Sequence, residues 1–328
     1  MRTVDIHTHL LSPAVRFDRL IDRFSVAFFA RKLGVDQRAL HSRPYQTYVQ
    51  AMASSIQHSA FVDKACLFGV DARFDRRGRQ IARDQTVCAM TENVLQVTAA
   101  HPDCFIPFLS VNPLRPGALE SIDRFVEQGC RGAKFLQNYW GLDLNDERLI
   151  PYYEKLASHA LPLIIHIGSE YTIRSDRRYE GAEMLDLPLA CNVRVIAAHM
   201  GLGRFIHKLM PWKNLSGDPR DFDADYFVLL ERLQSQPNLY ADISAILVPL
   251  RARALRHLSR QTQIHDKLLF GTDYPVPFTT TLNSYDLSWA TRRQISAIHN
   301  PFDRYVSAIL EYFPADNPIY RNYRKLLG

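Results

Sequence analysis

The sequence of 328 residues predicts an α/β fold, a (β/α)8 TIM-like barrel with a helical cap inserted after the first strand. Two patterns predict it: short apolar runs recur eight times, and amphipathic stretches lie between them. Strands that alternate with helices are typical of parallel βαβ units, and eight such units favour a barrel. The apolar runs cover residues 3–7, 64–70, 105–111, 132–136, 163–167, 193–199, 239–244 and 267–272.

The segments between these runs have the periodicity of amphipathic helices. We expect helices over residues 86–100, 117–128, 149–159 and 227–236. Gly129 follows the second of them as a C-cap, since glycine readily takes the left-handed conformation that ends many helices. A doubly wound open sheet is the alternative arrangement of such units. That fold usually carries a glycine-rich phosphate loop after its first strand, where this chain reads HTHLLSP.

The first connection, about residues 10–61, is far longer than an ordinary βα loop. It mixes helix-like segments with aromatic residues, and we expect it to cap the mouth of a single barrel domain spanning residues 1–328. Two further long inserts, residues 169–188 and 201–225, follow the fifth and sixth predicted strands. Long loops on that face are where such a fold places substrate specificity.

Composition and charge narrow the class of protein. The net charge is +6, but the basic residues are spread along the chain, so we expect no nucleic-acid partner. The chain has no apolar stretch long enough to span a membrane, and none of its five cysteines forms a C-x-x-C pair. We therefore expect a cytoplasmic protein that does not bind membranes and has no thiolate metal site.

Metal-binding side chains stand at the ends of several predicted strands. They are His7 and His9 on the first strand, His166 after the fifth, His199 after the sixth and Asp273 after the eighth. A lone histidine beyond an apolar run is more often a hydrogen-bonded core residue, and a lone aspartate before a turn is more often a cap. In a parallel barrel, however, all these strand ends share one mouth. Their coincidence predicts a metal site.

Imidazole and carboxylate ligands without thiolate suit Zn²⁺, Mn²⁺, Fe²⁺ or Co²⁺. We favour one divalent ion, zinc, with manganese as the alternative. An ion with an open position activates water at neutral pH. Asp273 would take the proton of that water, and His199 would orient it or act as an acid or base.

The order of these motifs, with Asp273 in the context GTDYP, resembles the amidohydrolase superfamily. More narrowly, it is similar to the amidohydrolase-2 group, which includes the aminocarboxymuconate-semialdehyde and resorcylate decarboxylases. The resemblance covers nearly the whole chain. Supporting segments are HPDCF at 101–105, GAKF at 132–135, LPLIIH at 161–166, LYADIS at 239–244 and NYRKLLG at 322–328.

The resemblance implies a distorted barrel that in this branch usually holds one metal, with His7, His9, His166 and Asp273 as ligands. It implies that His199 is the catalytic histidine beside them. In other branches a carboxylated lysine after the fourth strand bridges two metals. Lys134 could do this here, or it could anchor an anion, or its stem could simply pack.

Three structural roles also follow from the resemblance. His101 would act as a cap. Asp242 would make a hydrogen bond at its strand end, and Asp5 would support the histidine pair.

Substrate-binding residues are expected near the barrel mouth. Arg73 follows the second strand and Arg174 the fifth, and arginine pairs bidentately with carboxylates, so a small anionic substrate is predicted. Lys134 and Tyr139, at and just after the fourth strand, complete the predicted substrate contacts. Each of these could instead be a solvated surface residue or part of a loop core.

Three functions fit these patterns. We favour a metal-dependent hydrolase that uses metal-activated water on a small, carboxylated, cyclic or aromatic-derived substrate. The alternatives are a metal-dependent non-oxidative decarboxylase of an aromatic or muconate-type acid and a non-catalytic binding barrel. Many barrels of this kind pair through their outer helices, so a homodimer is also considered.

Overall fold

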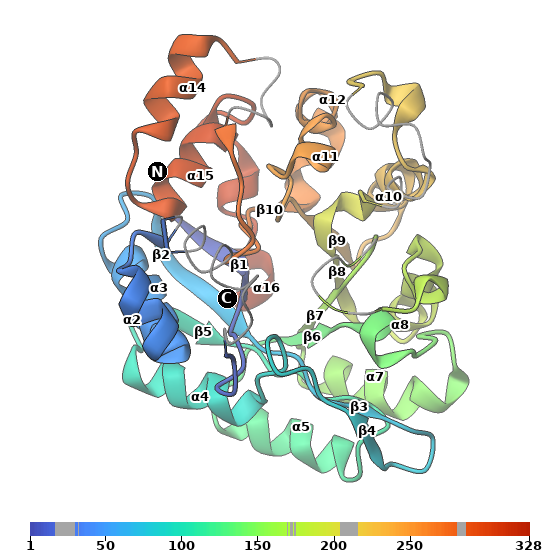
Figure 1. Cartoon of the computed structure of the whole chain (residues 1–328). Coiled ribbons are helices and arrows are strands. Elements are labelled where there is room, and N and C mark those ends of the chain that lie inside the picture. The colour runs from blue at the N-terminus through green and yellow to red at the C-terminus, as the bar shows by residue number, and fades with distance from the viewer. Residues whose placement is uncertain are drawn as a thin grey trace.

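A computed structural model of the chain describes residues 1–16, 30–31, 33–168, 170, 173, 175–203, 216–280 and 287–328. Eight parallel strands lie in the middle of the molecule, with helices around them (Figure 1). Each strand falls on one of the eight predicted runs. The strands are β1 (Thr3–His9), β2 (Val62–Phe68), β5 (Phe105–Pro107), β6 (Ala133–Phe135), β7 (Pro162–Ile165), β8 (Arg194–Ala197), β9 (Leu239–Asp242) and β10 (Leu268–Leu269).

The strands form two sheets, in the orders β1-β2-β5 and β10-β9-β8-β7-β6. Parallel bridges connect the sheets at both edges, Leu109 with Ala133 at one and Thr8 with Tyr274 at the other. At the second edge the His9 N–H also donates to the Tyr274 carbonyl at 2.8 Å. The strands thus follow one another in chain order around the centre, as the predicted (β/α)8 fold requires.

Helices follow most of the strands and cover the outside of the sheet (Figure 1). The four helices predicted from periodicity are confirmed, with the first beginning five residues later than expected. The helices described are α2 (Gln37–Ser42), α3 (Pro44–Gln57), α4 (Thr91–Ala100), α5 (Ala118–Glu127), α6 (Gln137–Trp140), α7 (Ile150–Ser158), α8 (Asp186–Ala190), α10 (Ala224–Ser235), α11 (Pro249–Ala252), α12 (Leu255–Ser259), α14 (Trp289–Ser296), α15 (Pro301–Leu310) and α16 (Arg324–Leu327). None of these helices is long and apolar enough to cross a lipid bilayer.

Helix α5 shows how the sequence ends these elements. Gly129 has a φ of +104°, and its N–H donates to the Val126 carbonyl at 2.9 Å. The next N–H, of Cys130, donates to the Phe125 carbonyl at 2.9 Å. This pair of bonds is the Schellman motif, which satisfies carbonyls left over at the helix end. The predicted C-cap role of Gly129 is therefore confirmed.

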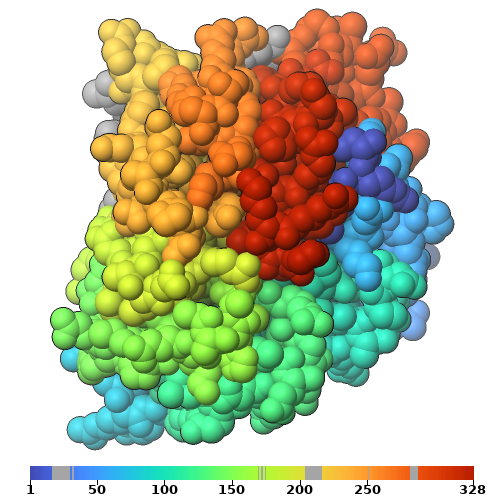
Figure 2. Space-filling view, turned by 180° about the vertical axis from the view of Figure 1, so that it is seen from behind, coloured from blue at the N-terminus to red at the C-terminus, as the bar shows by residue number. Residues whose placement is uncertain are grey.

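The barrel interior is a separate apolar core. It is formed by Val4, Ile6, Cys66, Phe68, Phe108, Ile164, Ile196, Ala198, Leu269 and Leu326. All but Leu326 lie on or beside the strands, whereas Leu326 belongs to α16, so the C-terminal helix packs against this core. Figure 2 shows the C-terminal residues, in dark red, beside the first residues of the chain on the face seen from behind. Because apolar side chains fill the barrel interior, we expect a functional site at the carboxyl ends of the strands.

A β-bulge changes the direction of side chains along β1. The pairing with β2 shifts register between Asp5 and Thr8, so regular alternation stops there. Ile6 lies in the interior core, and the next residue, His7, also faces inward, with its ring 5.0 Å from that of Phe68. Bulges re-aim side chains in this way. The bulge therefore allows the apolar interior and the histidine pair to share one strand.

The long first connection is described only in part. Within it, α3 packs on the outside of the strands, where the Tyr48 hydroxyl donates to the carbonyl of His9. The Asn300 side chain, just before α15, donates to the Ser55 carbonyl at 2.7 Å. Residues 17–29 and 32 lie outside the described residues, so the cap over the mouth stays a prediction.

A small hairpin after β2 was not predicted. Strands β3 (Arg73–Phe74) and β4 (Gln80–Ala82) pair antiparallel. Between them, the Gly78 N–H donates to the Asp75 carbonyl at 3.0 Å, and Gly78 has a φ of +74°. Two- and three-residue strands that are half-buried or exposed carry no apolar alternation, so periodicity does not detect them.

Candidate metal centre

Three of the predicted ligands meet at the carboxyl end of the barrel. One ligand atom each from His7, His9 and Asp273 lies within 4.8 Å of the other two. The Asp273 Oδ1 atom is 3.4 Å from His7 Nε2 and 3.0 Å from His9 Nε2. These atoms come from β1 and from the loop after β10, which are neighbours around the barrel. The predicted coincidence of separate strand ends is therefore seen for these three residues.

Hydrogen bonds orient the His7 ring. Its Nδ1 atom lies 2.7 Å from Oδ2 of Asp242, at the end of β9, and both side chains are fully buried. The pKa of Asp242 is held below its usual range, because the His7 and His199 rings and their hydrogen bonds outweigh the opposing effect of burial. A carboxylate only accepts hydrogen bonds, so Nδ1 carries the proton and Nε2, which faces Asp273, keeps its lone pair. A metal-binding histidine commonly has this arrangement.

Asp273 has a left-handed backbone, with a φ of +65°. Its N–H donates to the His7 carbonyl at 2.8 Å. The preceding Thr272 donates through its N–H and its hydroxyl to the Asp5 carboxyl, at 3.0 and 2.6 Å. Burial raises the pKa of Asp5 to about 7, although the bonds from Thr272 and His7 act against that rise. These bonds confirm the expected support of the histidine pair by Asp5 and hold the Asp273 turn in place.

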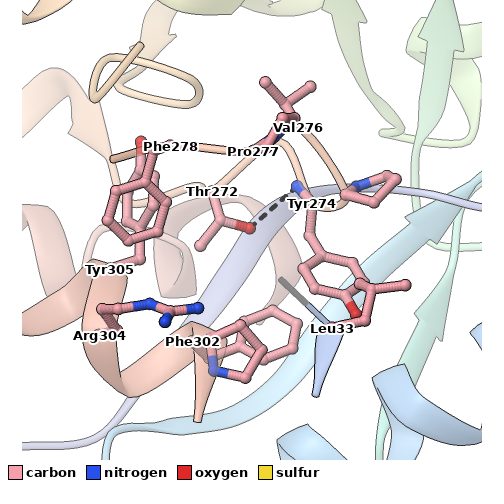
Figure 3. A pocket seen from close by; sticks show the side chains of 11 residues that line it. Leu33, Thr272, Tyr274, Val276, Pro277, Phe278, Phe302, Arg304 and Tyr305 are labelled. Atoms are coloured by element: carbon pink, nitrogen blue, oxygen red, sulfur yellow. Dashed lines mark hydrogen bonds between the residues drawn. The ribbon is translucent and has the colours of Figure 1, made fainter. Parts of the chain in front are cut away.

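The loop that carries Asp273 is packed from behind by aromatic rings (Figure 3). The Tyr274 ring stacks on that of Phe302 at 5.0 Å, and the Tyr274 N–H donates to the Thr272 hydroxyl at 3.1 Å. Phe278 and Tyr305 line the same side, around a cavity of only about 30 Å³. A space of that size holds about one water molecule. The rings therefore form a wall that fixes the loop.

His199 lies beside the three ligands. It follows β8 with a φ of +59°, and its Nε2 atom is 4.0 Å from the other carboxylate oxygen of Asp273, Oδ2. Burial lowers the pKa of His199 well below its ordinary value, and the charge of Arg251 lowers it further. Asp273 has its pKa held well below the usual range, because its imidazole neighbours outweigh the effect of burial. At neutral pH a neutral imidazole therefore faces a carboxylate.

His166, after β7, does not join the group of three within 4.8 Å. Its ring centre is 4.9 Å from that of His199, and its Nδ1 atom is 3.8 Å from Oε2 of Glu170. Burial lowers its pKa to about 4. The His166 Nε2 atom is buried and has no hydrogen-bond partner among the residues that the structure describes. Its role as a fourth ligand stays a prediction.

Lys134 is fully buried on β6, next to the histidine pair. Its Nζ atom is 3.3 Å from His7 Nε2 and lies 5.3 Å from the centre of the Phe68 ring. Burial lowers the pKa of Lys134 to about 8. A lysine in this position can act as a cation or, when deprotonated, as a nucleophilic amine.

A cavity of about 250 Å³ opens above these groups. Its polar floor is formed by His9, His166, Glu170, His199 and Asp273. Its walls are apolar, with Thr86 as the exception, and none of the described residues that line it is Lys or Arg. The apolar lining residues are Leu10, Leu11, Val70, Val87, Leu136, Pro275, Val276 and Pro277.

Like Lys134, two further predicted substrate contacts do not line this cavity. The Arg73 guanidinium lies against Gly141, where a Cβ atom would come within 2.8 Å of its NH2 group. The Tyr139 hydroxyl accepts a hydrogen bond from the Asp84 N–H at 3.1 Å and is part of the loop core. Arg174 lies outside the described residues. Roles for these three in substrate binding stay predictions.

Three residues in or beside the site were not predicted from the sequence. Glu170 lines the cavity four residues after His166, and Ser244 lies two residues after Asp242 with its hydroxyl 2.9 Å from His199 Nδ1. Their positions could have indicated a role in the site. Each is a polar residue within a few positions of a strand-end histidine or aspartate, and such a residue lies at the same mouth of the barrel. Arg251, on α11, was also missed; its Nε–H donates to the Leu202 carbonyl at 3.0 Å.

The donor set fits a divalent metal. His7 and His9 offer Nε2 and Asp273 offers Oδ1, and the second nitrogen of His7 already has a carboxylate partner. Two imidazoles and one carboxylate, without thiolate, are typical of catalytic zinc and related ions. The buried Nε2 of His166 needs a partner, as buried polar atoms generally do, and lies beside this group.

Comparisons with known proteins were made for the whole chain. A family model described as Amidohydrolase matches residues 4–293. No curated protein matches the sequence. The residues matched include all three of the metal-centre ligands.

Solved structures show the same fold at low sequence identity. An uncharacterized TIM-barrel protein from Bordetella bronchiseptica has a TM-score of 0.59 and 17% identity, covering 100% of this chain and 98% of the other. A protein described as a probable 2-pyrone-4,6-dicarboxylic acid hydrolase from Acinetobacter baumannii has a TM-score of 0.54 and 15% identity, with full coverage of both chains. The 2,6-dihydroxybenzoate decarboxylase from Rhizobium has a TM-score of 0.50 and 16% identity, covering 100% and 99%. At these identities the likeness concerns the fold.

Proposed function

The chain belongs to the amidohydrolase family, and on that premise we propose that it is a metal-dependent hydrolase of a small substrate. The observation that carries the proposal is the meeting of His7, His9 and Asp273, with His199 beside them. A protein that only binds a ligand has no need of a buried carboxylate paired with a neutral imidazole at a metal centre.

A divalent ion held by His7, His9 and Asp273, with His166 as a fourth ligand, would lower the pKa of water and polarise a carbonyl. The protein's own groups handle the proton. Asp273 turns Oδ1 to the histidine pair and Oδ2 to His199, so Oδ2 can take a proton on the side where His199 Nε2 can share it. His199 is neutral at rest because burial lowers its pKa, so it is ready to accept.

The cavity suggests the shape of the substrate. An apolar wall above a polar floor fits a compact ring or chain with one polar or anionic head group directed at the metal centre. Lys134, buried next to His7, places a positive charge beneath that head group, since its pKa of about 8 keeps it largely charged at neutral pH. This supports a substrate with one anionic group.

A decarboxylase is the second candidate, and the apolar wall favours it. Moving a carboxylate from water into such a cavity removes its hydration and favours loss of CO₂. The bond to the carboxyl carbon would break, and its electron pair would stay on the ring carbon. Asp273 or His199, having first taken up a proton from water, would deliver that proton there. The same residues serve both reactions.

Metal content tests the proposal first. We would measure it by elemental mass spectrometry on protein purified without chelator, beside a His7→Ala/His9→Ala variant. An exposed-histidine variant, His58→Ala, is the control. About one equivalent of zinc or manganese, lost only in the double variant, is expected. No metal after reconstitution with Zn²⁺ and Mn²⁺ would sink the proposal.

Activity then separates the two reactions. Metal-loaded protein would be incubated with carboxylated lactones, esters and aromatic acids, with CO₂ and titratable acid measured in parallel. Acid release without CO₂ supports the hydrolase, and CO₂ release supports the decarboxylase. The double variant shows whether either activity depends on the metal centre.

A further inference from the structure

Ser244 connects three elements of the site. It lies two residues beyond β9, is fully buried, and faces β1 and the turn after β8. Its Oγ atom is 3.1 Å from His7 Nδ1 and 2.9 Å from His199 Nδ1. The next residue, Ala245, donates its N–H to the Thr272 carbonyl at 3.2 Å, beside Asp273. A single side chain thus contacts the rings of both His7 and His199.

The hydrogen-bonding capacity of the Ser244 hydroxyl is fully used. A hydroxyl has one proton to donate and two lone pairs. Its proton goes to Oδ1 of Asp242, a carboxylate that can only accept. Its lone pairs then face the two ring Nδ1 atoms of His7 and His199, so each of those nitrogens must be a donor.

The backbone of Ser244 constrains His199 independently. The Ser244 carbonyl oxygen is 3.0 Å from His199 Nδ1. A carbonyl cannot donate, so His199 carries its proton on Nδ1 and leaves Nε2 for the cavity. The backbone N–H of His199 also donates to Asp242 Oδ1 at 3.0 Å, and this bond holds the backbone from which the ring extends.

We propose that Ser244 is a positioning residue that holds His199, and with Asp242 His7, in the Nδ1–H tautomer. Both rings thereby turn an unprotonated Nε2 towards the Asp273 carboxylate, 3.4 Å from Oδ1 for His7 and 4.0 Å from Oδ2 for His199. His199 can then take up and release a proton at Nε2 while its Nδ1 bonds stay unchanged. The inference rests on the proposed function only for its consequence in catalysis, because the tautomers exist in the protein without metal.

The tautomers can be observed directly in the wild-type chain. Protein labelled with ¹⁵N-histidine and freed of metal with a chelator would be measured by two-bond ¹H–¹⁵N correlation spectroscopy at pH 7.5. The signals are assigned with His7→Gln and His199→Gln variants. We expect a protonated Nδ1 and an unprotonated Nε2 for both rings. A protonated Nε2 on His199 would overturn the proposal, whatever the enzyme's reaction.

Variants of Ser244 test the hydroxyl itself. In Ser244→Ala the His199 Nδ1–H loses one of its two acceptors and keeps the Ser244 carbonyl, so the ¹⁵N shifts of His199 should move only part of the way towards values averaged over both tautomers. Zinc affinity should fall about tenfold, as for other residues that support metal ligands. Ser121→Ala removes another largely buried hydroxyl, which donates to the Gly117 carbonyl, and should change neither. Ser244→Thr keeps the hydroxyl and should retain the wild-type tautomer.

Unchanged His199 shifts together with unchanged zinc affinity in Ser244→Ala would refute the role of the hydroxyl. If that variant does not fold, the wild-type spectrum and Ser244→Thr still decide the tautomer. Failure of the proposed function has a different outcome: wild-type protein would bind no zinc, while its histidine spectrum would still show the predicted tautomers.

Discussion

Replacing Asp242 by Asn tests how the metal centre is held together. The two side chains are nearly the same size, but the carboxylate accepts hydrogen bonds with both oxygens and the amide with only one. Asp242 accepts from His7 Nδ1 at 2.7 Å and from the backbone N–H groups of His199 and Ser244 at 3.0 Å each. The Ser244 hydroxyl is a fourth donor.

The magnitude follows from the two ways in which the amide can lie. If its NH₂ group faces the Oδ1 side, three buried donors lose their acceptor, at about 1–3 kcal/mol each. If it faces His7 instead, the ring must move its proton to Nε2, and only one charge-assisted bond is lost, roughly 1.5–3 kcal/mol. The second arrangement costs less, so Asp242→Asn should fold with a free energy of unfolding reduced by about 2 kcal/mol.

The moved proton would lie on the nitrogen that faces the metal centre. We therefore expect zinc affinity to fall roughly 10- to 100-fold, measured by competition with a chromophoric chelator. Asp123→Asn is the matched control, because it also removes one carboxylate, which binds Lys155 and His159 on the outer helices. Zinc affinity within twofold of wild type in Asp242→Asn would refute the reasoning.

Three further outcomes follow from the same geometry. The pKa of His166 is about 4 when folded and 6.5 when free, so the unfolded chain binds more protons between these values. In the metal-free protein His166 alone should therefore contribute a loss of roughly 3 kcal/mol of unfolding free energy as the pH falls from about 7 to 4, and urea titrations of His166→Gln should show a correspondingly smaller loss. In Gly271→Ala the new Cβ would lie 3.1 Å from His7 Cβ and 3.2 Å from Ser244 Cβ, so zinc affinity should fall several-fold while circular dichroism stays unchanged. Lys134→Met should leave the stoichiometry at about one zinc and bind it more tightly, because a cation beside His7 Nε2 is removed; a fall from two equivalents to one would instead make Lys134 a bridging ligand.

The sequence was sufficient for the barrel and for much of the site. Buried parallel strands appear as short apolar runs, and their carboxyl ends must converge, so His7, His9 and Asp273 could be placed together without knowing any loop. The rings of His7 and His9, two residues apart on β1, lie 5.2 Å from each other. The apolar runs and the convergence of the carboxyl ends are both properties of parallel strands, whose geometry varies little from protein to protein.

The rest depends on tertiary contacts that no periodicity encodes. Arg73 lies five residues after β2, much as Asp273 lies four residues after β10, yet the hairpin that begins at Arg73 directs it to Gly141. The bulge in β1 likewise leaves no mark in the apolar pattern, although it decides that His7 faces inward. A residue that closely follows a strand can therefore be assigned to the carboxyl-end face of the barrel from the sequence. The direction in which its side chain points cannot be assigned in this way when the residue lies in a loop.

Backbone strain shows why the supporting residues matter as much as the ligands. His199 and Asp273 both have left-handed backbones, which for residues other than glycine cost about 1 kcal/mol or more each. Each is held by a hydrogen bond from its own N–H, to Asp242 Oδ1 and to the His7 carbonyl. The same Asp242 carboxylate that sets the tautomer of His7 therefore also stabilises the strained turn of His199. Loosening one of these bonds should disturb His7 and His199 together, so the proposed metal ligand and the proposed proton acceptor should respond as a coupled unit.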